Sequence, residues 1–93
     1  MNQDELTQEL KYAQQQFAQN NTYAAIKSLR QILTLDEQMA EAHALLALTL
    51  LTQQRYYGAQ QEAKRALSLA PQLPMAHYAQ AQVWIAQRQF KRA

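Results

Sequence analysis

The two histidines are the side chains best suited to chemistry in this sequence, because imidazole can bind a metal or move a proton near neutral pH. They stand at positions 43 and 77. Neighbouring packed helices lie roughly 8–10 Å apart, which is wide for two imidazoles that share a metal ion. No third ligand is evident beside them. We therefore expect His43 and His77 to be structural residues.

The remaining reactive residue types do not form a recognisable catalytic set. The seven acids are dispersed, and the two adjacent pairs, Asp4-Glu5 and Asp36-Glu37, fall where helices begin or turn. A catalytic carboxylate pair needs a shared pocket and a perturbed environment. The absence of cysteine excludes disulfides, thiol catalysis and zinc–cysteine sites. The single glycine, Gly58, makes no phosphate-binding loop. We predict that the protein is not an enzyme and that it binds no metal and no cofactor.

The charge is distributed unevenly along the chain. Residues 1–41 carry six acids and three bases, a net charge of −3, whereas residues 42–93 carry one acid and six bases, a net charge of +5. The six bases fall in three places at turns or helix flanks, and no aromatic residues are interleaved with them as single-strand binders require. We therefore expect no nucleic acid partner.

Targeting signals and membrane segments are not evident. The first residues lack a basic region followed by an apolar one, so they do not resemble a signal peptide. The longest apolar stretch, residues 42–51, is far shorter than the roughly 20 residues of a membrane-spanning helix. We expect a cytoplasmic location and no membrane contact from this segment.

Composition and apolar spacing predict an all-α domain. Alanine and glutamine dominate, β-branched residues are sparse, and only one glycine and two prolines are present. Asn2 with Glu5 predicts a capped helix start, and Asn21 or Thr22 is expected to cap the second helix. Pro71 must end a helix and Pro74 suits the first turn of the next. The helices are expected at 4–19, 22–35, 40–53, 56–70 and 74–87, with a sixth that starts at 90.

The sequence repeats itself every 34 residues. A shift by 34 superposes Ala13 on Ala47 and Ala81, and it superposes His43 on His77. We divide this single domain into repeats at about 6–39, 40–73 and 74–93, the last of which is truncated.

These repeats resemble the tetratricopeptide repeat (TPR) family. The clearest copy opens with Ala-Glu-Ala-His-x-x-Leu-Ala at residue 40, continues with Tyr-x-x-Ala at Tyr56, and closes with Ala-Leu-Ser-Leu-Ala-Pro at Pro71. The first copy departs from the pattern, with Ile32 where alanine is usual and Glu37 where proline is usual. The resemblance implies a right-handed α-solenoid of antiparallel helix pairs, here five full helices and a truncated sixth.

The resemblance also implies a protein-interaction function. In this family the first helix of each repeat lines a concave face along which peptides bind. Carried over position by position, that face consists of Leu10, Gln14, Phe17, Ala44, Leu48, Leu51, Tyr78, Gln82 and Ile85. These residues are mostly apolar, and the Lys and Asn residues with which some members clamp a C-terminal carboxylate are missing. We expect the partner to be an apolar or amphipathic peptide or helix of another protein.

Two alternatives remain open. The same residues could be covered by later repeats or by a partner subunit. The segment could also be a structural or oligomerisation part of a larger, bacterial-type protein whose activity lies downstream. We expect an N-terminal fragment of a longer chain, because the third repeat stops four residues into its second helix. The uncovered stripe around Ala81 and Trp84 then predicts association through the C-terminal helix, most simply as a homodimer.

Overall fold

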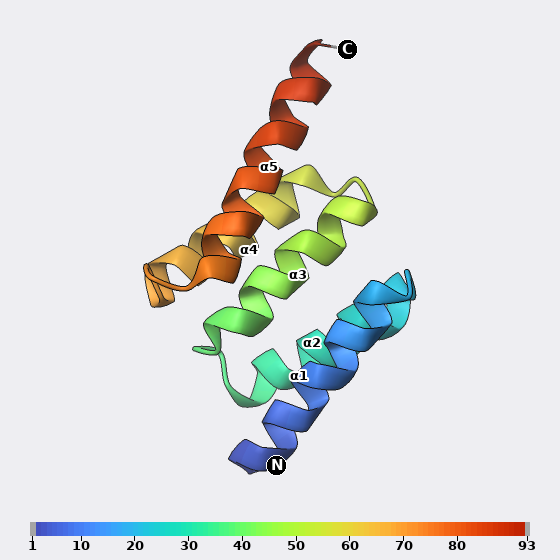
Figure 1. Ribbon diagram of the computed structural model, residues 1–93, viewed down its shortest axis with the longest axis vertical. Coiled ribbons are helices and arrows are strands. Elements are labelled where there is room, and N and C mark those ends of the chain that lie inside the picture. Colours follow the sequence, from blue (N-terminus) through green and yellow to red (C-terminus); the bar gives the residue numbers. More distant parts are fainter. Residues whose placement is uncertain (1, 93) are drawn as a thin grey trace.

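The computed structural model of the protein describes residues 2–92, with side chains for residues 2–89. It contains five α-helices and no strand within that range: α1 (Gln3–Ala18), α2 (Thr22–Leu35), α3 (Ala40–Thr52), α4 (Tyr56–Leu69) and α5 (Pro74–Arg92). The helices α1, α3 and α5 run in one direction, and α2 and α4 return between them (Figure 1). The all-α prediction is confirmed, and the first four helices lie within one residue of their predicted ranges.

The predicted sixth helix is wrong, because α5 continues without a break to Arg92. The turns after α1 and α3 each need one residue with positive φ, Asn20 at 62° and Gln54 at 61°. Such a conformation is unfavourable outside glycine, and packing of the following helix must offset it. Arg88, which stands 34 positions after Gln54, lies inside α5 and not in a turn. The side chains of Phe90 and Ala93, assigned to the sixth helix, lie outside the described residues.

The 34-residue period is present in the backbone geometry as well as in the sequence. The bounds of α2 and α4 differ by 34 at both ends. The first turn is closed by the Asn21 N–H, which donates to the Gln16 carbonyl at 2.8 Å. The second is closed in the same way by the Arg55 N–H and the Leu50 carbonyl at 3.0 Å. The all-α fold is therefore repeat-like: the turns after α1 and α3 have the same geometry, and α2 and α4 have the same bounds after a shift of 34.

The two predicted helix caps have different outcomes. The Asn2 cap is confirmed, because the Glu5 N–H donates to Asn2 Oδ1 at 2.9 Å. On α2 Asn21 occupies the N-cap position, but the predicted side-chain cap is wrong: the Asn21 amide donates to Gln16 Oε1 at 2.8 Å, and the Thr22 hydroxyl donates to the Asn20 carbonyl. The Asn21 backbone, at φ −87° and ψ 73°, is not in the extended conformation that suits a capping side chain.

The core is centred on α3, which packs against α2, α4 and α5 and touches α1. Nine of its thirteen residues are buried. Three alanines of α4 that are fully buried, Ala59, Ala63 and Ala66, allow close approach of its backbone to its neighbours. Among the described residues, α2 does not pack directly against α4, and α1 does not pack directly against α5. The start of α1 and the end of α5 lie at opposite ends of the 45 Å long axis (Figure 1).

Candidate functional site

A hollow of about 260 Å³ lies over α3, between α1 and α5. It brings together five of the nine residues that the sequence assigned to the groove, and these come from all three repeats. The hollow is lined by Phe17, Leu48, Leu51, Thr52, Tyr78 and Gln82. Phe17, Leu48 and Leu51 are half-buried and pack on the core, while the Tyr78 side chain is 57% exposed at the rim.

The other four predicted groove residues do not line this hollow. Leu10 and Ala44 belong to the core, with exposed fractions of 8% and 0%, because α1 turns Leu10 into the buried stripe of Leu6 and Ala13 and α3 is surrounded by helices. Gln14 is half-buried on α1 without contributing to the lining. Ile85 borders a different hollow of about 230 Å³, together with Trp84, Arg88 and Gln89. The accessible part of the predicted groove is therefore narrower than the repeat pattern indicated.

The chemistry of the hollow is that of an apolar contact surface with a few polar atoms at its edge. No charged side chain is among its lining residues. The Thr52 hydroxyl is already engaged, since it donates to the Thr49 carbonyl at 2.6 Å. The volume is below the 300–1,000 Å³ typical of small-molecule sites. It suits one or two apolar side chains of a peptide better than a free metabolite.

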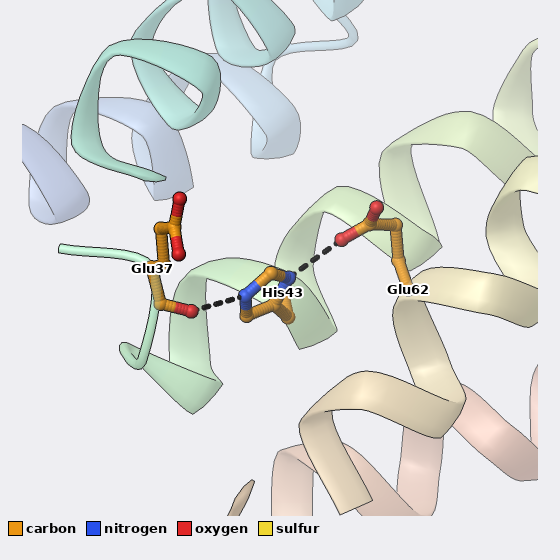
Figure 2. A network of polar contacts seen from close by, with 3 residues as sticks. All are labelled: Glu37, His43 and Glu62. Carbon is orange, nitrogen blue, oxygen red and sulfur yellow. Dashed lines mark hydrogen bonds and ion pairs between the residues drawn. The ribbon is translucent and has the colours of Figure 1, made fainter. Parts of the chain in front are cut away.

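A larger depression of about 660 Å³ lies on the other side of α3, between α2 and α4. It is lined mainly by charged and polar residues: Arg30, Leu33, Thr34, Glu37, His43, Leu46, Glu62 and Arg65. Its central polar groups bind one another, as Figure 2 shows. Both ring nitrogens of His43 in this depression are therefore already engaged within the protein.

His43 joins three parts of the fold through its two ring nitrogens (Figure 2). Nε2 lies 2.7 Å from the Glu37 carbonyl oxygen in the α2–α3 connection, and Nδ1 lies 2.6 Å from Glu62 Oε1 on α4. A carbonyl and a carboxylate are both acceptors, so only the doubly protonated ring donates to both. The hydrogen bond to Glu62 raises the pKa of His43, while burial of the ring and the positive charge of Arg65 oppose that rise.

The pairing of His43 with Glu62 was not predicted from the sequence. The two residues are 19 positions apart, and neither belongs to a motif that demands the other. One signal does point to it. Glu62 directly precedes Ala63 in the buried stripe of α4, and a carboxylate at that edge needs a partner across the helix interface.

Comparison with family models, with curated protein sequences and with solved structures found no match to this chain. Within residues 2–92, no helix is both long and apolar enough to cross a membrane. No group of three or more histidine, aspartate and glutamate side chains among the described residues is arranged to hold a metal ion.

Proposed function

We propose that this chain is a TPR-type α-solenoid of a cytoplasmic protein, and that it works as a non-catalytic protein-interaction module. Its concave face, formed by the first helix of each repeat, binds an apolar or amphipathic peptide or helix of another protein. The single observation that carries this proposal is the hollow lined by Phe17, Leu48, Leu51 and Tyr78, because it gathers predicted groove residues from three repeats.

The character of the hollow determines the class of ligand. Burying an apolar side chain against this surface is worth about 1.5–3 kcal/mol. An acidic C-terminal tail would gain little there, because none of the lining residues is cationic. The Gln82 amide and the Tyr78 hydroxyl at the edge provide hydrogen bonds to a peptide backbone or a polar flank.

Replacement of Leu48 by glutamate tests the proposal. The variant places a charge among the apolar lining residues, so binding of an apolar or amphipathic peptide should be lost while the helical content is unchanged. A panel of amphipathic, aliphatic and acidic-tail peptides is titrated against the parent and against Leu48→Glu, with circular dichroism as the measure of helicity.

Leu35→Glu is the matched control, because Leu35 is 54% exposed at the end of α2, outside the hollow. This variant should bind the same peptides as the parent. Preferential binding of acidic tails, or equal loss of binding in both variants, would contradict the proposed groove.

A structural role within a larger assembly is the second candidate function. The observation that favours it is the apolar surface of α5, where Trp84 and Ile85 are exposed. Light scattering across a dilution series distinguishes a self-associating segment from a monomeric binding module.

A further inference from the structure

A further hollow, of about 290 Å³, lies between α2 and the turn that joins α3 to α4. Half of its lining residues are cations and none is an acid; the lining consists of Tyr23, Ile26, Lys27, Arg30, Gln53 and Arg55. We name this hollow, defined by these six residues, the basic hollow. It shares no lining residue with the hollow formed by Phe17, Leu48 and Tyr78, so it is a separate part of the surface.

The three cations of the basic hollow have no anionic partner within the described part of the protein. Among the side chains of residues 2–89 the only ion pair joins His43 to Glu62, so Lys27, Arg30 and Arg55 form none. All three residues are exposed. Like charges gathered around one hollow repel one another, so the stability of the fold does not explain this cluster.

The start of α4 adds to the positive potential at the basic hollow. Arg55 is the N-cap residue of α4, and its side chain makes no capping hydrogen bond. The first turn of α4 contains no acidic residue. The positive end of the helix dipole therefore has neither a side-chain cap nor an acidic residue beside it, and an anion bound next to Arg55 is stabilised by the dipole as well as by the cations.

The next repeat shows that the repeat pattern does not require these cations. The residues 34 positions after Lys27, Arg30 and Arg55 are Gln61, Lys64 and Gln89. Two of the three positive charges are thus absent there. Gln60 and Gln87 follow Ile26 and Gln53 by the same interval, and the Gln87 amide donates to Gln60 Oε1 at 2.9 Å. A neutral hydrogen bond therefore occupies the positions that line a cationic hollow in the preceding repeat.

The larger depression between α2 and α4 adjoins the basic hollow, and Arg30 lines both. It adds a volume of about 660 Å³ and an apolar side chain, the half-buried Leu33. Glu37 and Glu62 also line it, so a uniformly negative chain such as a nucleic acid would be repelled there. An extended peptide with one anionic side chain and apolar neighbours fits both parts of this surface.

The charge of the basic hollow favours a phosphorylated side chain over a carboxylate. A phosphomonoester carries a charge of about −1.5 to −2 near pH 7 and has three acceptor oxygens. Arg30 and Arg55 each present a planar set of guanidinium donors, and Lys27 adds an ammonium group. A single carboxylate would leave most of this positive charge unbalanced.

We propose that the basic hollow binds a phosphorylated side chain of an extended peptide from another protein. An apolar side chain next to the phosphorylated residue lies in the larger depression, beside Leu33. This site goes beyond the concave face proposed above, because it lies on the other side of α3 and selects a ligand by charge.

The probe is an acetylated and amidated peptide with one phosphoserine flanked by leucines. Isothermal titration calorimetry compares it with the same peptide carrying serine, and with one carrying glutamate, at the central position. We expect saturable binding of the phosphopeptide. The other two peptides should bind at least about tenfold more weakly, because they lack the dianionic group and its oxygens.

Substitution of the cations tests whether the phosphopeptide binds at this hollow. Arg30→Gln and Arg55→Gln each remove one charge from an exposed position and should weaken binding about tenfold. Lys64→Gln is the matched control, because Lys64 is the exposed repeat equivalent of Arg30 and lines neither hollow. It should change the affinity by less than about twofold. Circular dichroism should show the same helical content in all three variants.

Leu48→Glu separates this site from the concave face. It should bind the phosphopeptide as the parent protein does, whereas the proposal for the concave face predicts that it loses amphipathic peptides. Arg30→Gln should show the reverse behaviour. Loss of phosphopeptide binding in Leu48→Glu would place the ligand in the concave hollow and overturn the proposed site.

Four other results would also overturn the proposal. The first is equal affinity for the phosphoserine and serine peptides. The second is equal weakening by Arg30→Gln and Lys64→Gln, which would show a response to net charge alone. The third is binding of inorganic phosphate as tight as that of the phosphopeptide, because the ligand would then be a free anion. The fourth is tighter binding of a single-stranded oligonucleotide that Arg30→Gln abolishes.

Discussion

The helices α3 and α5 contain equivalent positions of the repeat, but these positions are buried in α3 and exposed in α5. In α3 the residues that face α4 are buried, as are nine of the thirteen residues of the helix. In α5 the equivalent residues are exposed, and in the part of the helix up to Gln89 only Ala76, Ala79 and Val83 are fully buried. The backbone around the two helix starts is nevertheless the same, since the Ala42 and Ala76 N–H groups donate to carbonyls three residues earlier at 3.1 and 3.0 Å.

This difference shows which features of a repeat depend on its local sequence and which depend on packing against neighbouring helices. The turn before the helix, the helix start and the contact of the histidine Nε2 with the carbonyl six residues earlier are the same in α5 as in α3. Burial is not reproduced, because each helix of a repeat stack acquires its hydrophobic contacts from the elements on either side. The change in the free energy of unfolding on substitution should therefore depend on the residues that surround the site, and not on its position in the repeat.

The largest expected effect comes from truncating the equivalent residues Leu50 and Trp84. Leu50→Ala removes a nearly fully buried side chain under α4 and should destabilise the fold by about 2–5 kcal/mol. Trp84→Ala removes a larger side chain that is more than half exposed, and it should change stability by less than about 1 kcal/mol. Urea unfolding followed by circular dichroism gives both values.

Each of these two outcomes has its own consequence. A small loss in Leu50→Ala would mean that α4 does not cover α3 tightly. A decrease of several kcal/mol in the free energy of unfolding of Trp84→Ala would mean that the side of α5 that carries Trp84 is buried in solution. Either result would remove the contrast between the two helices.

A pH-dependent effect of intermediate size should distinguish the two histidines. The folded protein binds the His43 proton more tightly than the unfolded chain does, because its pKa is raised by the hydrogen bond to Glu62. The stabilisation is therefore complete below the ordinary value of 6.5 and is lost as the pH rises through the folded pKa. The free energy of unfolding should fall as the pH is raised from about 6 to about 9.

His43→Gln should lower the free energy of unfolding by about 1–3 kcal/mol at pH 6. In this variant the free energy of unfolding should no longer fall as the pH rises. His77→Gln is the matched control, since His77 is exposed and has no carboxylate partner among the described residues. It should retain the pH dependence of the parent. A parent protein whose stability is flat over this interval would contradict the link between His43 and Glu62.

Much of the fold could be predicted from the sequence because it depends on local signals. Pro71, Pro74 and the Asn2 cap mark helix ends, and the 34-residue period aligns the remaining turns. The continuation of α5 could not be predicted by this route. At Arg88 the repeat predicted a turn, but a turn is favourable only when the following helix packs back, and that depends on contacts beyond the local pattern.

The candidate site was only partly predictable for a related reason. Helical periodicity identifies which residues of α1, α3 and α5 share a side, and Phe17, Leu48 and Tyr78 do meet. Periodicity does not state how closely neighbouring helices approach. Ala44 and Leu10 were therefore placed on a surface when they are covered, and Thr52 at the end of α3 was omitted.

The smallest expected effect comes from Gly58, which occupies in α4 the position that Ala24 occupies in α2. Alanine is favoured over glycine within a helix by about 0.5–1 kcal/mol, because glycine has more conformational freedom to lose. The added Cβ would lie 3.4 Å from Leu50 Cδ1, an ordinary van der Waals contact with a flexible side chain. Gly58→Ala should therefore stabilise the protein by that amount, measured as a higher urea midpoint with an unchanged slope.

The reverse exchange at the equivalent position supplies the control. Ala24→Gly should destabilise α2 by a similar amount, because both sites are half-buried and each is the third residue of its helix. If Gly58→Ala were destabilising while Ala24→Gly behaved as expected, the helix-propensity argument would hold and the contact with Leu50 would be the cause. Combining Gly58→Ala with Leu50→Ala removes that contact, so a gain that appears only in the double variant would locate the strain between α3 and α4.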